Sequence, residues 1–173
     1  MTIDEPIKIV DYTDHWLTDY ASEKDRIRGV FKKLEINIEH IGGTAVPGLA
    51  SKPIIDIMFG VNSFPPQQQT ISEIVDLGYV NLGEAGVPGR IYFRRRGSIA
   101  FNIHLAQYLG ELWNTNLAVR DFLRSHSSAC DCYASVKRQA VESGNSMLLE
   151  YSEAKKDYVK KLVSRAIQWR TTG

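Results

Sequence analysis

A single carboxylate interrupts an otherwise apolar run in the first half of the sequence. The run IIDIMFGV, at residues 54–61, has the length and β-branched composition of a buried strand, and Asp56 is its only charged residue. A buried charge is unfavourable unless it is paired, hydrogen-bonded or bound to a metal ion. The chain must therefore fold so that other residues supply a partner for Asp56.

The pattern around this run predicts an α+β fold. Glycines, prolines and changes of hydrophobic period separate strand-like from helix-like segments. Strands are expected at residues 7–10, 36–41, 52–61, 90–96 and 98–107, and helices at 13–34, 68–77, 112–125, 129–142 and 148–169. This order predicts a mixed sheet with helices on one face at residues 1–110. A helical C-terminal region at 111–173 is expected to pack on that core as one compact unit.

The composition excludes several classes of function. The 173 residues include 21 Lys and Arg and 20 Asp and Glu, so no overall charge attracts nucleic acid or an anionic membrane. Any phosphate must be bound by a local arrangement of charges. No signal peptide and no run of about 18 apolar residues is apparent, which predicts a cytoplasmic protein. The two cysteines, Cys130 and Cys132, are expected to be reduced thiols.

Alternation along the strands places Asp56 on a polar face of the sheet, because successive side chains of a strand point to opposite faces. The apolar rows are Ile55, Ile57 and Phe59; Ile99, Phe101, Ile103 and Leu105; and Ile91 and Phe93. If these rows share one face, Asp56 shares the other with Asn102, His104, Tyr92 and Arg94. Carboxylates and imidazoles are ordinary metal ligands, and arginine suits phosphate. This face is a candidate site, although hydrogen bonds to the preceding turn would satisfy Asp56 without any function.

Two glycines before the strand have the spacing found in a P-loop. Gly43 and Gly48 match that spacing, but Leu49 and Ala50 stand where the motif requires Lys and then Ser or Thr. The sequence therefore excludes a Walker-type ATPase.

Another arrangement of the same segment fits phosphate better. Gly42 and Gly43 let a backbone approach a phosphate closely, and Thr44 adds a hydroxyl and is expected to cap a short helical turn. Lys52 lies just before the strand and adds a positive charge. A tight turn with no ligand explains the two glycines equally well, so both interpretations stay open.

The segment HIGGTAVPGLASKPIIDI resembles the signature of the GrpB family, also called UPF0157. The resemblance continues in DHWLTDY near the start, in FNIHLAQ, and in VRDFLR and YASVKRQA of the helical region, so it covers nearly the whole chain. It implies a nucleotidyltransferase-like core with a helical C-terminal region.

The nucleotidyltransferase superfamily pattern is matched at all but two acidic positions. Its glycine pair corresponds to Gly42 and Gly43, and its first acid to Asp56. The second acid is replaced by Met58, and the strand of the third acid offers Asn102 and His104. Two-metal phosphoryl transfer needs several carboxylates, so the resemblance implies an incomplete set.

These observations leave an enzyme and a binding module open. As an enzyme, the protein would transfer a nucleotidyl group with Asp56 and His104 as catalytic residues, or act as a one-metal phosphoesterase. The expected cofactor is a divalent ion, Mg²⁺ or Mn²⁺, held by Asp56, His104 and Asn102. Phosphate contacts are expected from Gly42, Gly43, Thr44, Lys52, Arg94 and Lys137. As a catalytically degenerate module, the chain would keep a nucleotide or phosphoester partner without the chemistry, or would act on another protein.

Overall fold

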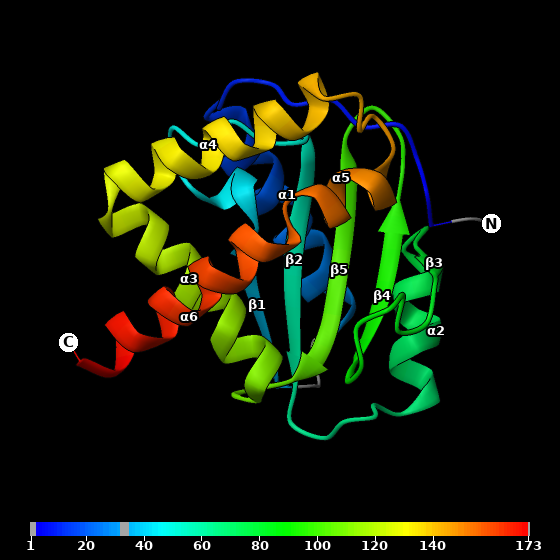
Figure 1. The fold of residues 1–173 in the computed structure, drawn as a ribbon. Helices are drawn as coiled ribbons and strands as arrows, with labels where there is room; N and C mark the ends of the chain where they lie inside the picture. Colours follow the sequence, from blue (N-terminus) through cyan, green and yellow to red (C-terminus); the bar gives the residue numbers. More distant parts are fainter. Residues whose placement is uncertain (1–2, 32–34, 173) are drawn as a thin grey trace.

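The computed structural model describes residues 3–31 and 35–172, which form a five-stranded sheet covered by helices on both faces (Figure 1). The strands are β1 Ile36–Ile41, β2 Ile54–Val61, β3 Val80–Asn81, β4 Arg90–Arg95 and β5 Ala100–Gln107. The helices are α1 His15–Val30, the short 3₁₀ helix η1 Gly43–Ala45, α2 Gln68–Asp76, α3 Glu111–Ser125, α4 Ser127–Glu142, α5 Leu148–Ala154 and α6 Lys156–Thr172. The predicted α+β class and mixed sheet are confirmed.

The order of strands in the sheet is β1-β2-β5-β4-β3. The β2–β5 pair is parallel and the other three pairs are antiparallel. In this register Asp56 pairs with Asn102, which in turn pairs with Arg94. The topology therefore brings residues that are far apart in sequence into one row across the middle of the sheet.

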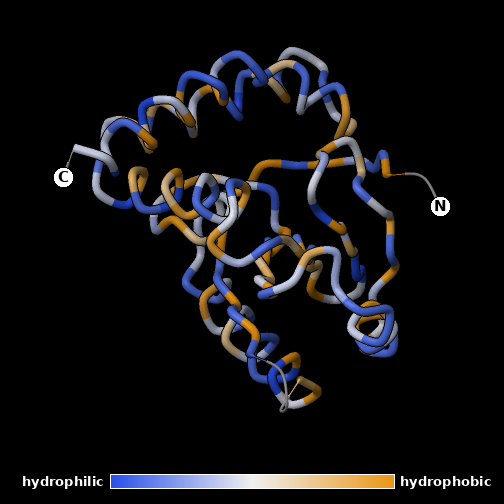
Figure 2. The backbone as a smooth tube through the Cα atoms, turned by 90° about the horizontal axis from the view of Figure 1, so that it is seen from below, coloured by the Kyte–Doolittle hydropathy of each residue, from blue (hydrophilic) through white to orange (hydrophobic). Residues whose placement is uncertain are grey.

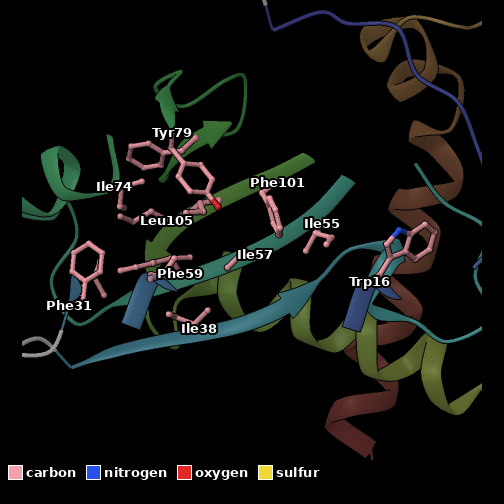
Figure 3. Packing of buried hydrophobic residues seen from close by; sticks show 14 residues of the cluster. Trp16, Phe31, Ile38, Ile55, Ile57, Phe59, Ile74, Tyr79, Phe101 and Leu105 are labelled. Atoms are coloured by element: carbon pink, nitrogen blue, oxygen red, sulfur yellow. The ribbon is translucent and has the colours of Figure 1, made fainter. Parts of the chain in front are cut away.

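One face of the sheet carries the main hydrophobic core, which lies under α1 and α2. Side chains of β1, β2 and β5 point to the same side there, as Ile38, Ile57 and Phe101 illustrate (Figure 3). The predicted rows of β2, β4 and β5 meet in this cluster, except for Ile99, which lies before β5 and is exposed. The polar face predicted from strand alternation is therefore the opposite one.

The opposite face lies under the C-terminal helices. Trp113 and Leu117 of α3 pack on Met58, Ile41 and Ala106 of the sheet. A further cluster joins α3, α4 and α6 to the segment after η1. Hydrophobic and hydrophilic residues alternate along the helical tubes, as expected for helices that cover a core on one side (Figure 2). The division of the chain at residue 110 stays a prediction.

Three expectations for the first 50 residues are wrong. Residues 7–10 do not form a strand, because only an isolated bridge joins Val10 to Ser51 at this segment. Helix α1 ends at Val30, not at Leu34, which lies outside the described residues. Thr44 does not cap a helical turn, because it lies inside η1 and its Oγ1 is 3.0 Å from Nε2 of His40.

The single helix expected at residues 148–169 is also wrong, because the chain breaks it into α5 and α6 at Lys155. Lys155 has φ −105° and ψ 1°, outside the helical range. No glycine or proline marks the break, so tertiary packing overrides the helical pattern here. In the part of the chain that the structure describes, no helix is long and apolar enough to cross a membrane.

Candidate functional site

Asp56 lies at the centre of a line of hydrogen bonds across the polar face of the sheet. Its Oδ1 accepts a bond of 2.7 Å from Nδ2 of Asn102 and one of 3.1 Å from Nε2 of His104. Burial alone raises the pKa of the Asp56 carboxyl, but these two bonds and the charge of Lys52 outweigh it and hold the pKa well below its usual range. Asp56 is therefore ionised, and the partner that its position in the strand requires is present.

Two arginines fix the orientation of these partners. Nδ1 of His104 lies 2.9 Å from Arg90, and Oδ1 of Asn102 lies 3.0 Å from Arg96. A guanidinium can only donate, so both atoms accept. His104 is therefore the neutral tautomer with its proton on Nε2, and Asn102 turns its NH₂ group towards Asp56. Both neighbours are donors to the carboxylate.

This donor arrangement does not fit a divalent cation. A metal ion requires lone pairs, yet His104 and Asn102 present N–H groups to Asp56, and their acceptor atoms are bonded to arginines. Among the described residues, moreover, no group of three or more His, Cys, Asp or Glu could hold a metal ion. The metal set Asp56, His104 and Asn102 is brought together as predicted, but as a hydrogen-bonded chain.

Met58 occupies the position of the second superfamily acid and belongs to the apolar packing. Its side chain is 1% exposed and contacts the cluster formed with Trp113 and Leu117 of α3. A carboxylate there would lie against these apolar groups on one side and beside Arg90 and His104, which line a small pocket with Met58, on the other. The methionine at this position is therefore part of the packing between the sheet and α3.

A pocket of about 200 Å³ opens beside Asp56 and is called here the lysine pocket. Its lining is formed by Gly42, Gly43, Thr44, Ser51, Lys52, Ile54, Asp56, Tyr133, Lys137, Tyr151 and Lys155. These residues come from the β1–η1 turn, the start of β2, α4, α5 and the break before α6. Three lysines face one carboxylate, so the pocket suits an anion.

The three lysines lie over two tyrosine rings. Nζ of Lys137 is 4.5 Å from the centre of the Tyr133 ring, and Lys155 and Lys52 are 5.0 and 6.0 Å from that of Tyr151. Burial is the main cause that lowers the pKa of all three, to about 7 for Lys137 and about 8 for Lys155. An anionic ligand would raise the pKa of the lysines that it contacts.

The two glycines are required by the geometry of the pocket. Gly42 has φ +70°, and a Cβ there would lie 2.6 Å from Oδ2 of Asp56. A Cβ on Gly43 would lie 2.0 Å from Oγ of Ser51 and 2.5 Å from Nζ of Lys137. A side chain at either position would therefore fill the space beside the charged groups.

A second pocket, called here the apolar pocket, adjoins the first. Its volume is about 350 Å³, and it shares Lys52 and Ile54 with the lysine pocket. Its other lining residues are Glu5, Pro6, Ile7, Lys8, Pro53, Arg96 and Ala100. Small-molecule sites commonly measure about 300–1,000 Å³, which the two adjoining pockets together reach.

The structure gathers most of the predicted phosphate contacts and leaves one elsewhere. Gly42, Gly43, Thr44, Lys52 and Lys137 all line the lysine pocket. Arg94 is on the predicted face but is not among those lining residues; it bonds to the backbone oxygen of Ile3 and lies 3.3 Å from Glu5. A long side chain can reach away from the site that its strand position suggests.

Five lining residues were not predicted as site residues from the sequence, namely Ser51, Ile54, Tyr133, Tyr151 and Lys155. Tyr133, Tyr151 and Lys155 come from the C-terminal helices, whose return over the sheet no local pattern reveals. Ser51 directly precedes Lys52 in the family signature, and this position could have identified Ser51 as a candidate site residue.

Comparison with solved structures defines the class of fold. The structure of Cid1 poly(U) polymerase bound to MgATP matches with a TM-score of 0.51 and 12% identity, covering 75% of this chain and 45% of that one. Terminal uridylyl transferase 4 from Trypanosoma brucei, with bound dUTP, matches with a TM-score of 0.51 and 13% identity, over 78% and 47%. The chain has a nucleotidyltransferase-like fold.

Closer relatives define the family. The family model described as GrpB protein matches residues 6–165, and the chain belongs to the GrpB family. The crystal structure of GrpB from Enterococcus faecalis matches with a TM-score of 0.85 and 27% identity, over 94% of this chain and 99% of that one.

Two curated relatives share 30% identity with the chain. UPF0157 protein SCO7215 of Streptomyces coelicolor aligns over 92% of this chain and 84% of its own. UPF0157 protein YqkA of Bacillus subtilis aligns over 95% of this chain and 48% of its own, so the chain spans about half the length of that relative.

Proposed function

We propose that this chain binds a nucleotide or a related phosphoester, with the phosphates in the lysine pocket. The observation that carries the proposal is the convergence of Lys52, Lys137 and Lys155 on one pocket whose only carboxylate, Asp56, is already bonded by two donors. Burial lowers the pKa of each lysine because the charged form is poorly solvated in the pocket, and a bound phosphate would give Lys52 and Lys155 a further anionic partner.

The organic part of the ligand would enter the apolar pocket. Lys52 and Ile54 form a wall common to both pockets, so a ligand with phosphates at one end and a flat apolar group at the other can occupy both. A nucleotide has this shape. The nucleotides in the titles of the structural neighbours are consistent with it, although likeness at 12–13% identity supports only the fold.

Binding in this proposal needs no metal ion fixed by the protein. The carboxylates that a two-metal clamp requires are replaced by Met58 and Asn102, and lysines neutralise the phosphates instead. The divalent ion expected from the sequence stays a prediction, to be tested by measuring binding with and without it.

Isothermal titration calorimetry tests the proposal directly. Purified protein is titrated with ATP, UTP, inorganic tripolyphosphate and uridine, each with and without Mg²⁺. We expect the triphosphates to bind without Mg²⁺, tripolyphosphate to bind more weakly and uridine most weakly. Lys52→Ala and Lys155→Ala should each weaken ATP binding by about tenfold, as expected for losing one charged hydrogen bond.

The matched control is Lys161→Ala, which removes the same charge from an exposed position of α6. It should leave the affinity for ATP unchanged. The proposal is wrong if none of the phosphate probes binds, or if the pocket variants bind ATP as tightly as the control.

A further inference from the structure

Ser51 and Lys137 form a hydrogen-bonded pair on the wall of the lysine pocket. Nζ of Lys137 donates to Oγ of Ser51 across 2.8 Å and to the backbone oxygen of Ala50 across 3.2 Å, and the Ser51 hydroxyl donates to the backbone oxygen of Leu49 across 3.1 Å. The two side chains are 86 residues apart in sequence, one just before β2 and the other in α4. Both residues are almost fully buried, at 3% and 4% exposure, yet both line the pocket. The hydroxyl and the amine are therefore held together beside the ligand space.

Lys137 is held as an amine that can accept a proton. Among the described residues, Lys137 forms no salt bridge. Its hydrogen-bond acceptors are the hydroxyl of Ser51 and the backbone oxygen of Ala50. Burial, followed by the charges of Lys155 and Lys52, lowers its pKa to about 7. A neutral amine within hydrogen-bond distance of a hydroxyl is the arrangement that activates a serine in Ser–Lys enzymes.

The pocket gives a ligand access to this pair. Gly43 lies directly over it, since a Cβ there would come within 2.0 Å of the serine oxygen. Lys52 and Lys155 lie on the same pocket and can hold phosphate oxygens near that oxygen.

We propose that Ser51 is a nucleophile and Lys137 its general base, and that together they attack a phosphorus atom of the phosphoester bound in the lysine pocket. The inference rests on the proposed function, because that function supplies the electrophile. A bond forms between Oγ of Ser51 and phosphorus, and the bond from phosphorus to the leaving oxygen breaks. For this step the Ser51 hydroxyl turns from Leu49 to the neutral amine of Lys137, 2.8 Å away, and its proton passes to Nζ.

The products depend on which phosphorus reacts, and the atoms balance in each case. With a nucleoside triphosphate, attack at the α position leaves a nucleotidyl group on Ser51 and releases pyrophosphate. Attack at the γ position leaves a phosphoryl group on Ser51 and releases the nucleoside diphosphate. The charge on the leaving group is neutralised by Lys52 and Lys155, which replaces the role that metal ions have in two-metal transfer.

The experiment uses the intact protein with ATP labelled at the α or at the γ phosphorus. The protein is separated from free nucleotide, counted, weighed by mass spectrometry and digested to locate the modified residue. We expect a covalent label on Ser51 in the wild type. The α and γ labels distinguish nucleotidyl from phosphoryl transfer, and either product supports the proposal.

Two variants separate the roles of the pair. Ser51→Ala removes the nucleophile, and Lys137→Arg keeps the charge but cannot accept a proton at neutral pH. Each should reduce labelling by at least about 100-fold, as expected from losing a nucleophile or a general base. The matched control, Ser164→Ala, removes a hydroxyl from an exposed position of α6 and should not change labelling.

The outcomes distinguish this inference from the function on which it rests. If ATP binds but leaves no label, or if the label maps to another residue, the nucleophile assignment is wrong and the binding function stands. If ATP does not bind at all, the proposed function itself fails. Peptide mapping of the wild type decides the assignment even if a variant does not fold.

Discussion

His104 donates its Nε2 hydrogen to Oδ1 of Asp56 across 3.1 Å, while Nδ1 of the same ring accepts from Arg90. Arg90 therefore determines which tautomer faces the carboxylate. On the other side, Arg96 sets the amide orientation of Asn102 in the same way. The residues that the sequence suggests as metal ligands thus form a chain of donors around one anion. Because these residues donate hydrogen bonds and do not offer lone pairs to a metal ion, substitutions should affect ligand binding differently from substitutions at a metal site.

Asp56→Asn should strengthen the binding of ATP in the absence of metal ions. The amide keeps an oxygen that can accept from His104 and Asn102, and it removes a negative charge from the wall of an anion pocket. We expect the affinity to rise by about fivefold, roughly 1 kcal/mol, from the lost repulsion. Calorimetry on the wild type and the variant measures the difference.

The opposite result would identify Asp56 as a metal ligand. If Asp56→Asn weakens ATP binding by more than tenfold only when Mg²⁺ or Mn²⁺ is present, the carboxylate holds the ion and the donor arrangement must rearrange on binding. Lys161→Ala serves again as the control for unspecific changes in charge.

The polar face could be predicted from the sequence because strand alternation has a period of two residues. The alternation within each strand was enough to assign Asp56, Asn102 and His104 to one face. The register between β2 and β5 confirms this placement. The segment from Gly42 to Asp56 could be recognised as a family signature. Local pattern and family resemblance therefore located one wall of the pocket.

The other wall could not be predicted, because it depends on how the C-terminal helices return over the sheet. Lys155 lies at the break between α5 and α6, where it lines the pocket. No glycine or proline marks that break in the sequence. The pairing of Ser51 with Lys137 spans 86 residues. The polarity of His104 depends on the side chain of Arg90, which strand periodicity does not orient.

Met58→Asp should destabilise the protein without creating a catalytic metal site. The methionine is 1% exposed and packs against Trp113 and Leu117, so a carboxylate there is desolvated. We expect the free energy of unfolding to fall by about 3 kcal/mol, in the range for a poorly compensated buried charge. Urea denaturation of Met58→Asp and of the control Met58→Leu measures it, and the control should lose less than about 1.5 kcal/mol. An unchanged stability of the aspartate variant would show that the packing around α3 accepts a charge.

Gly43→Ala should separate the Ser51–Lys137 pair. A Cβ at this position would lie 2.0 Å from the serine oxygen and 2.5 Å from the lysine nitrogen, so one of them must move. We expect covalent labelling by ATP to be lost and the melting temperature to fall. Gly29→Ala is the matched control, since a Cβ there meets nothing within 4 Å and the residue lies in α1. The control should be neutral or stabilising by up to about 1 kcal/mol. Equal behaviour of the two variants would contradict the close contact.

Acid should destabilise the fold through His40. The ring is 4% exposed and stacks on Tyr20 with centres 4.5 Å apart, and burial lowers the pKa of His40 to about 4. The unfolded state binds a proton near pH 6.5 and the folded state only near pH 4, so stability falls as the pH decreases through this window. The loss is up to about 3 kcal/mol. His40→Gln keeps a polar side chain without titrating, and denaturation curves from pH 7 to 4 should show a smaller decrease for it. Parallel curves for the two proteins would remove His40 from this role.

The rate of covalent labelling should depend on pH with a maximum between about 7 and 8. Lys137 must be neutral to accept the proton of Ser51, so the rate rises through its pKa of about 7. Lys155 must be charged to hold the phosphates, so the rate falls above its pKa of about 8. The groups that act on Lys137 are the charges of Lys155 and Lys52, which lower its pKa, and Cys130 and Asp56, which raise it.

Single variants should remove one side of this profile at a time. Lys155→Ala is expected to label slowly at every pH but to lose the decrease above pH 8, because the group that titrates there is absent. In the same variant the rise should move to higher pH, since the neighbouring charge that lowers the pKa of Lys137 is gone. A rate that is independent of pH from 6 to 9 in the wild type would contradict a lysine base and leave Ser51 without an activating partner.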